Sequence, residues 1–300
     1  MPRPLSKRAI TPAKLAALWT PYTAFRAKQL APSTIKRDYA RTTSAIARLP
    51  KSLESAVEIR DWLLSCRSAE YTRRLIQQFN ACCEWACGSE LYDRNPFLGM
   101  AKQLRVTKNH ENLWTAFEAE ERDIIIQAFE DQDPFFVPWV KFLFWTGCRP
   151  AEAAALKWEN IKLDLSEIHF AHAAPIGCEV QKTKTKRDRF FPVNNRLRIF
   201  LIAIRPSATH REEFVFSGEK GGRMEHHNFQ QRHWKPLVEG LVKKGEVFRY
   251  MPQYHCRHTW ITLALDHMSV SDCAYFSGNS PDIIYKHYAS RKRDTKIPEF

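Results

Sequence analysis

The sequence lacks a long apolar segment, an internal repeat and any block of low complexity. No apolar run approaches the ~18 residues that a membrane-spanning helix needs, so we expect no transmembrane segment. The first eight residues (MPRPLSKR) contain no hydrophobic stretch of the kind that a signal peptide requires. We therefore expect a cytoplasmic protein.

Signatures of nucleotide and metal binding are also missing. The sequence has no G-x-G-x-x-G or Walker-type loop and no alternating series of strands and helices, which disfavours a nucleotide-binding sheet. Cys83 and Cys87 are four residues apart, but no second pair has the spacing of zinc ligands. His226, His227 and His233 lack a matching cysteine or carboxylate pattern. We expect no metal and no cofactor, and eight cysteines that are reduced and mostly buried.

What the sequence does contain is enough chain for two domains and an excess of positive charge. It has 300 residues, of which 44% are hydrophobic, so it should fold around two cores. It carries 46 Lys and Arg against 33 Asp and Glu, a formal net charge of +13. Such an excess favours a polyanionic partner, because phosphates attract Lys and Arg. An ordinary basic surface is the alternative that composition leaves open.

The spacing of apolar residues predicts an α+β fold that is mostly helical and has two parts. Residues 1–97 read as an all-helical domain, and residues 98–112 as a polar, basic linker. Residues 113–300 read as a mixed domain with one small β-sheet. The predicted helices lie near 12–25, 32–49, 54–66, 70–88, 117–130, 136–146, 195–204, 228–243, 256–267 and 281–288. The predicted strands lie near 167–171, 177–184 and 189–193, the last two as a hairpin.

A first candidate site lies in the segment 146–152 (TGCRPAE). A strongly apolar helix ends at Gly147, and a new helix begins at Pro150, a residue favoured in the first turn. Arg149 lies in the turn between them, where backbone N–H groups and a guanidinium can bind a phosphate together. Taken alone, this segment is better explained by a surface ion pair between Arg149 and Glu152.

Two further segments carry basic groups. Residues 182–192 (KTKTKRDRFFP) crowd lysines and arginines into a turn. A lysine-rich hairpin tip can enter a DNA groove or reach a leaving oxygen, although a solvated charged turn is the commoner meaning of such a run. Residues 254–260 (YHCRHTW) place Arg257 and His258 at the start of an amphipathic helix.

The segment 277–290 (SGNSPDIIYKHYAS) ends in a tyrosine. Ser280 is placed to cap a helix and Pro281 to start it. Tyr288 then falls near the end of that helix, where a tyrosine is usually a core or surface aromatic. Each of these segments is modest by itself, but their order and spacing are not.

In that order and spacing, the chain resembles the tyrosine recombinase (phage integrase) family over nearly its whole length. The family's T-G-x-R-x-x-E box matches residues 146–152, and its R-H-T triplet matches residues 257–259. The hairpin lysine precedes a proline by eight residues in this family, which selects Lys184 before Pro192.

The nucleophile of the family follows a G-H pair by nine residues. Counted from Asn279, this selects Tyr288 and leaves Tyr285 at the wrong offset. Two positions depart from the pattern, because Tyr254 replaces the histidine of the H-x-x-R box and Asn279 replaces the histidine of the G-H pair; His255 is one residue along. Both replacements keep a hydrogen-bond donor and remove a group that titrates near neutral pH.

The resemblance implies a site-specific DNA recombinase, or integrase. Such an enzyme cleaves and rejoins DNA through a 3′-phosphotyrosyl link and uses neither metal nor ATP. In the implied site a tyrosine attacks, arginines clamp the phosphate, a lysine protonates the leaving oxygen and two further groups donate hydrogen bonds. These residues are Tyr288, Arg149, Arg257, Lys184, Tyr254 and Asn279, with Glu152, His255 and His258 as accessory candidates.

The resemblance also implies partners. Residues 1–97 would be a core-binding domain and residues 113–300 a catalytic domain, which together bind double-stranded DNA. Recombination implies a homotetramer on paired DNA sites, with DNA-bending or directionality proteins as accessories, in a bacterial or phage-encoded protein at the nucleoid. Candidate base contacts in the helical domain are Arg37, Arg41, Arg73 and Arg74, although a solvated helix face is the commoner meaning of any one of them.

Two alternatives stay open. A DNA-binding protein that kept the fold and lost activity would explain Tyr254 and Asn279. A type IB topoisomerase would relax DNA by the same chemistry without exchanging strands between sites. The separate helical domain favours the recombinase.

Overall fold

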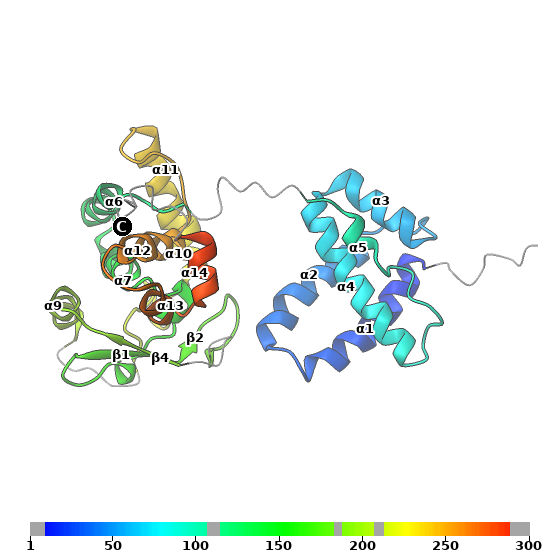
Figure 1. Ribbon diagram of the computed structural model, residues 1–300, viewed down its shortest axis with the longest axis horizontal. Helices are drawn as coiled ribbons and strands as arrows, with labels where there is room; N and C mark the ends of the chain where they lie inside the picture. The colour runs from blue at the N-terminus through cyan, green and yellow to red at the C-terminus, as the bar shows by residue number, and fades with distance from the viewer. Residues whose placement is uncertain (1–9, 107–114, 183–187, 207–212, 289–300) are drawn as a thin grey trace, which may run out of the picture. The chain divides into compact units, whose positions relative to one another are not determined.

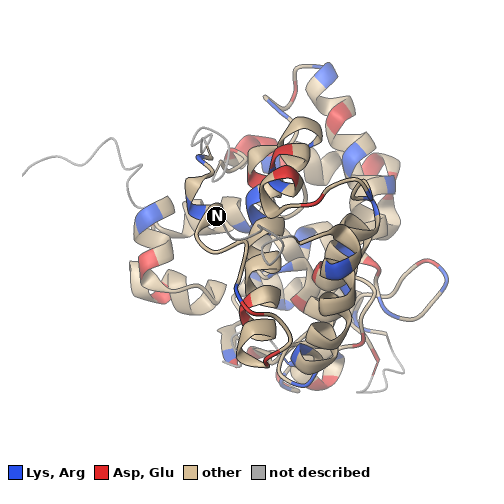
Figure 2. Ribbon diagram, turned by 90° about the vertical axis from the view of Figure 1, so that its right-hand side faces the viewer, with Lys and Arg blue, Asp and Glu red and all other residues tan. Residues whose placement is uncertain are grey.

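The chain divides into two compact units, Met1–Asn109 and His110–Phe300 (Figure 1). The computed structural model describes residues 10–106, 115–182, 188–206 and 213–288. None of the helices within these ranges is long and apolar enough to cross a membrane. Lysines and arginines occur along many elements with acidic residues between them (Figure 2). Charge alone therefore does not mark a binding face, and the pairing of individual side chains has to be considered.

Within residues 10–106 the N-terminal unit is all helical, as the apolar spacing predicts. Three of its helices begin at side-chain caps, because Thr11, Ser55 and Ser68 each accept a backbone N–H from the first turn. Aromatic side chains such as Trp19 and Phe79 fill its core. The elements are α1 (Pro12–Ala27), η1 (Thr34–Tyr39), α2 (Ala40–Ala47), α3 (Ala56–Cys66), α4 (Ala69–Gly88) and α5 (Met100–Gln103).

The C-terminal unit packs helices around a second aromatic core, in which Trp139 and Trp234 are almost fully buried. Helix α12 packs against α6, α7 and α13, and α13 packs against α14. These helices are α6 (Ala119–Gln132), α7 (Val137–Thr146), α8 (Pro150–Ala153), α9 (Asn195–Ile204), α10 (His226–Phe229), α11 (Lys235–Lys243), α12 (His255–Ala264), α13 (Val270–Ser277) and α14 (Pro281–His287). Short 3-10 and π segments join them at η2 (Pro134–Phe136), η3 (Trp158–Asn160) and η4 (Gln230–Trp234). The mostly helical α+β class is confirmed.

The strands pair differently from the prediction. β1 (Glu167–Phe170) pairs antiparallel with β4 (Arg189–Pro192), and β2 (His172–Ala173) pairs with β3 (Gln181–Lys182). The predicted hairpin between 177–184 and 189–193 is therefore wrong within the described residues. The physical reason is burial, since β4 alternates buried and exposed positions and lies beside β1, whose alternate residues also point into the core.

Candidate active site

The turn between α7 and α8 places Arg149 as the sequence predicts. Gly147 ends α7 with a left-handed φ of 59°, and Pro150 opens α8 directly after Arg149. The guanidinium of Arg149 donates from Nη1 to Glu152 Oε1 at 2.8 Å and from Nη2 to the carbonyl oxygen of Gly278 at 2.7 Å. These two bonds connect the α7–α8 turn to the end of α13.

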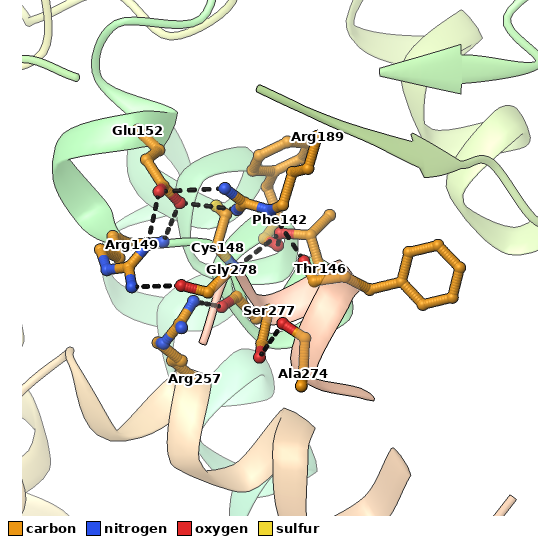
Figure 3. Close-up of polar contacts among 12 residues, drawn as sticks. Phe142, Thr146, Cys148, Arg149, Glu152, Arg189, Arg257, Ala274, Ser277 and Gly278 are labelled. Atoms are coloured by element: carbon orange, nitrogen blue, oxygen red, sulfur yellow. Dashed lines mark hydrogen bonds and ion pairs between the residues drawn. The ribbon is translucent and has the colours of Figure 1, made fainter. Parts of the chain in front are cut away.

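Glu152 is the centre of the cluster rather than half of a surface pair. Its side chain is 2% exposed, and Figure 3 shows guanidinium groups converging on it. It accepts a hydrogen bond from the backbone N–H of Arg149 and a bidentate contact from Arg189 Nη1 and Nη2, at 3.0 and 2.7 Å. Burial acts to raise the pKa of Glu152, but Arg189 and Arg149 outweigh it and hold this pKa at about 2. The carboxylate is thus ionised at neutral pH.

Arg257 brings a third guanidinium from the first turn of α12. It is 1% exposed, and its Nη1 donates to the carbonyl oxygen of Gly147 at 2.9 Å. Its Nη2 is buried and has no hydrogen-bond partner among the described residues. Burial and the nearby charge of Arg149 lower the pKa of Arg257 to about 10, which still leaves it charged at pH 7. A buried cation with an unused donor is a strong place for an anion.

The side chains of Tyr288 and His258 meet inside the unit. Tyr288 follows the last residue of α14, is 5% exposed and packs in an apolar cluster with Ile261 and Ile284. Its hydroxyl shares a hydrogen bond with Nδ1 of His258, which is also buried. The ring of His258 in turn lies 5.3 Å from that of Tyr254. The side chains of Tyr288, His258 and Tyr254 are therefore in successive contact, and Tyr254 is the one beside Arg149.

Tyr254 and His255 lie at the start of α12. Burial acts to lower the pKa of Arg149, but the carboxylate of Glu152 and the hydroxyl of Tyr254 outweigh it, so the pKa is raised. The ring of His255 lies 4.9 Å from that of His258, and burial lowers the pKa of His255. Tyr254 thus lies beside Arg149, whereas the ring of His255 contacts His258, the residue that shares a hydrogen bond with Tyr288.

Asn279 follows the left-handed Gly278 that ends α13. It lines an open pocket of about 900 Å³ together with Arg149, Arg189 and Tyr275. The pocket is therefore bordered by the same cluster that holds Glu152. Lys184 lies outside the described residues; β3 ends two residues before it at Lys182.

Arg189 belongs to the cluster although the motifs did not predict it. In the sequence it is one of several charges in a basic turn, but it opens β4 and is 4% exposed. A signal was present, because Arg189 and Phe191 are two residues apart and so lie on one face of a strand. A basic residue on an inward face demands a buried partner, and here that partner is Glu152.

Metal binding finds no support in side-chain placement within the described ranges. No group of three or more His, Cys, Asp or Glu side chains there is arranged to hold a metal ion. His226 contacts the carbonyl oxygen of Ala174, and His233 contacts Asp133.

Comparisons with known proteins find one family model and a set of solved structures. The family model, described as the phage integrase family, matches residues 107–290. No curated protein matches the chain in sequence. The Tn1549 transposon integrase in complex with a circular intermediate DNA has 15% identity and a TM-score of 0.76, over 93% of this chain and 96% of that one.

Lambda integrase structures are similar as well. A dimer bound to a COC′ core site has 14% identity and a TM-score of 0.71, over 98% of this chain and 81% of that one. A tetramer bound to a Holliday junction has 14% identity and the same TM-score of 0.71, over 98% and 82%. At such identities the likeness to solved structures concerns the fold.

Proposed function

The chain belongs to the phage integrase family of site-specific DNA recombinases, and we propose that it cleaves and rejoins DNA through Tyr288. The Tyr288 hydroxyl oxygen attacks the scissile phosphorus, the bond from phosphorus to the 5′-oxygen breaks, and a 3′-phosphotyrosyl link remains. The 5′-hydroxyl of a second strand then attacks this link and releases Tyr288. One phosphoester replaces another, so the exchange needs no ATP.

The observation that carries this proposal is the arginine cluster. Arg149 and Arg189 form ion pairs with Glu152, and the charge of Arg257 acts on the same carboxylate, so these four side chains have a net charge of +2. The buried Nη2 of Arg257 offers a donor that no described residue uses. A phosphodiester gains negative charge on its non-bridging oxygens as it is attacked, and guanidinium forks match that geometry.

Proton transfers complete the mechanism. We assign the proton of Tyr288 to His258, because the two side chains share a hydrogen bond. Lys184 donates a proton to the leaving 5′-oxygen. Tyr254, with its hydroxyl beside Arg149, and Asn279, at the edge of the pocket, donate hydrogen bonds to the phosphate. Tyr288 has to leave its buried position to reach a phosphate in the pocket.

A nicked suicide DNA substrate tests the nucleophile. Wild-type protein is expected to form a covalent DNA adduct, and Tyr288→Phe to form none. Tyr285→Phe is the matched control, because Tyr285 lies on α14 three residues before Tyr288 and is exposed. No adduct from the wild type would favour the alternative of an inactive DNA-binding protein, and an adduct that persists in Tyr288→Phe would exclude this nucleophile.

We also propose that the N-terminal unit binds DNA through one groove. The groove holds about 430 Å³ between α2 and α3, and Trp62 and Tyr71 line it with small residues such as Ser44. Its basic lining residues are Lys36, Arg37, Arg41, Arg48 and Arg67. No carboxylate lines the groove in the described part of the chain. Such a surface suits phosphate contacts and stacking.

Of the arginines that the sequence suggested, Arg37 has an ion pair with Asp38 at 3.6 Å, and two others share one acidic partner. Arg73 and Arg74 both contact Glu70, at 3.1 and 2.7 Å. We therefore expect Arg41→Ala or Arg48→Ala to weaken DNA binding and to reduce the salt slope by ~0.9 for each lost phosphate contact. Arg74→Ala is the matched control, and anisotropy titrations across salt concentrations measure both. Groove variants that behave like the control would exclude this face.

We propose that the active assembly is a homotetramer on two paired DNA sites, associated with the nucleoid and assisted by DNA-bending or directionality proteins. The lambda integrase tetramer bound to a Holliday junction supports this by likeness of fold. Strand exchange between two matched sites tests it, with complexes sized on native gels. Relaxation of supercoiled plasmid without exchange would instead favour the topoisomerase alternative.

A further inference from the structure

We propose that Arg189 is a positioning residue for DNA cleavage, which neutralises and orients Glu152 so that Arg149 and Arg257 keep their charge for the phosphate. The proposal rests on the function proposed above. It concerns a residue that is not among the site residues implied by the family resemblance.

The guanidinium of Arg189 is held on every side. Nη1 and Nη2 contact both oxygens of Glu152, and Nε donates to the carbonyl oxygen of Phe276 at 2.8 Å. The ring of Phe170 lies 4.4 Å from its central carbon. Nε, Nη1 and Nη2 of Arg189 all donate to protein oxygens, whereas Arg149 is 31% exposed and Arg257 Nη2 has no partner among the described residues, so Arg149 and Arg257 are the groups left for a phosphate. Arg189 therefore acts through its neighbours.

Those neighbours set the direction of Arg149. Glu152 accepts both the backbone N–H and Nη1 of Arg149, and Arg189 donates to both oxygens of the same carboxylate. Gly278 permits this crowding, because an added Cβ there would lie 3.1 Å from Arg189 Nη1 and 3.2 Å from Arg149 Nη1. Arg189 thus links β4, α8 and the end of α13, three residues before Asn279.

Charge gives Arg189 its second effect. With Arg189 present, three guanidiniums face one carboxylate and the net charge is +2. Without it, Glu152 would be compensated by Arg149 and Arg257 alone, and the net charge would fall to +1. Because the site is buried, that difference is poorly screened. Replacing Glu152 with glutamine as well would restore +2.

Single-turnover cleavage of the suicide substrate at saturating DNA tests the proposal. Arg189→Met is expected to slow adduct formation by ~10², the lower end of the effect of one lost electrostatic group, with DNA affinity near wild type. Arg189→Met/Glu152→Gln is expected to recover ~10-fold or more, since removing both partners of a buried pair is milder than removing one. Arg198→Met, at an exposed position on α9, is the control.

The amplitude of the single-turnover reaction separates this role from a folding defect. The final adduct yield measures the fraction of folded, active protein, whereas the rate constant measures the speed of the cleavage step. A purely structural role would lower the yield and leave the rate constant unchanged, which would overturn the proposal. A double variant as slow as Arg189→Met would also overturn it. If Arg189→Met does not fold, Arg189→Lys decides, because it keeps the charge and should keep most of the rate; a ~10² loss there contradicts the charge argument. Wild type without adduct would instead refute the proposed function.

Discussion

Gly147 allows a quantitative test of how the active-site turn is built. Its φ of 59° is in the left-handed region, and an added Cβ would lie 2.7 Å from ring atoms of Trp260. Its carbonyl oxygen accepts the hydrogen bond from Arg257 Nη1. Gly147→Ala therefore strains the backbone, displaces an indole and disturbs the contact that holds a catalytic candidate.

The magnitude has two parts. A non-glycine residue in the left-handed region costs roughly 1–2 kcal/mol. Forcing an extra methyl group against a packed ring costs typically ~1–3 kcal/mol. We expect Gly147→Ala to lower the free energy of unfolding by about 2–5 kcal/mol, a large share of the ~5–15 kcal/mol that holds an ordinary domain together. Cleavage should slow as well, because Arg257 loses its fixed partner.

Equilibrium urea denaturation followed by circular dichroism measures the loss. Gly177→Ala is the matched control, since its φ is 66° and nothing lies within 4 Å of the added Cβ. The control should show only the backbone part, and Gly147→Ala/Trp260→Leu should recover the packing part. A Gly147→Ala variant that loses no more stability than Gly177→Ala would refute the reasoning.

Other predictions follow from single contacts. The pKa of Glu152 is about 2 in the folded protein, below its value in the unfolded chain. The ionised carboxylate therefore stabilises the fold above about pH 4.5, and this stabilisation is lost as the pH falls towards 2. In urea denaturation, Glu152→Gln should be less stable than wild type at pH 7, and the two free energies of unfolding should converge near pH 2. Asn279→Ala should slow adduct formation by up to ~10², and a wild-type rate would remove Asn279 from the phosphate pocket. His258→Phe should slow adduct formation by ~10² or more in single-turnover assays. An unchanged rate would show that His258 does not accept the proton of Tyr288. Among the eight cysteines, Cys66 is exposed, Cys87 is half-buried and the other six are buried, so iodoacetamide should label Cys66 fastest; an unchanged rate of labelling in Cys66→Ser would contradict this order.

Local signals predicted much of the fold. The helix that begins at Pro281 after the Ser280 cap and the turn between Gly147 and Pro150 lie where capping chemistry puts them. Helix α13 was missed, although Ser269 caps it. Its eight residues are too few for apolar spacing to stand out from the background.

Contacts between distant residues were harder to predict. The partner of β4 depends on which faces the core buries, and no local pattern encodes that. The motifs predicted Arg149, Glu152, Tyr254, Arg257, His258 and Tyr288, and the structure brings them into one region. The sequence could not show that Glu152 is buried between two arginines, because that depends on Arg189 arriving from a strand 37 residues away.

The burial of Tyr288 has a consequence for the order of events on DNA. Under the proposed function, an incoming duplex would meet the partly exposed Arg149 at an open pocket, whereas the Tyr288 side chain is 5% exposed and its hydroxyl shares a hydrogen bond with His258. With Tyr288 as the proposed nucleophile, we expect encounter and cleavage to be separate kinetic stages, so that a brief collision with unrelated DNA ends before the tyrosine is presented. Selection of the correct DNA site in such an enzyme can depend on how long the DNA stays bound, in addition to direct contacts with its bases.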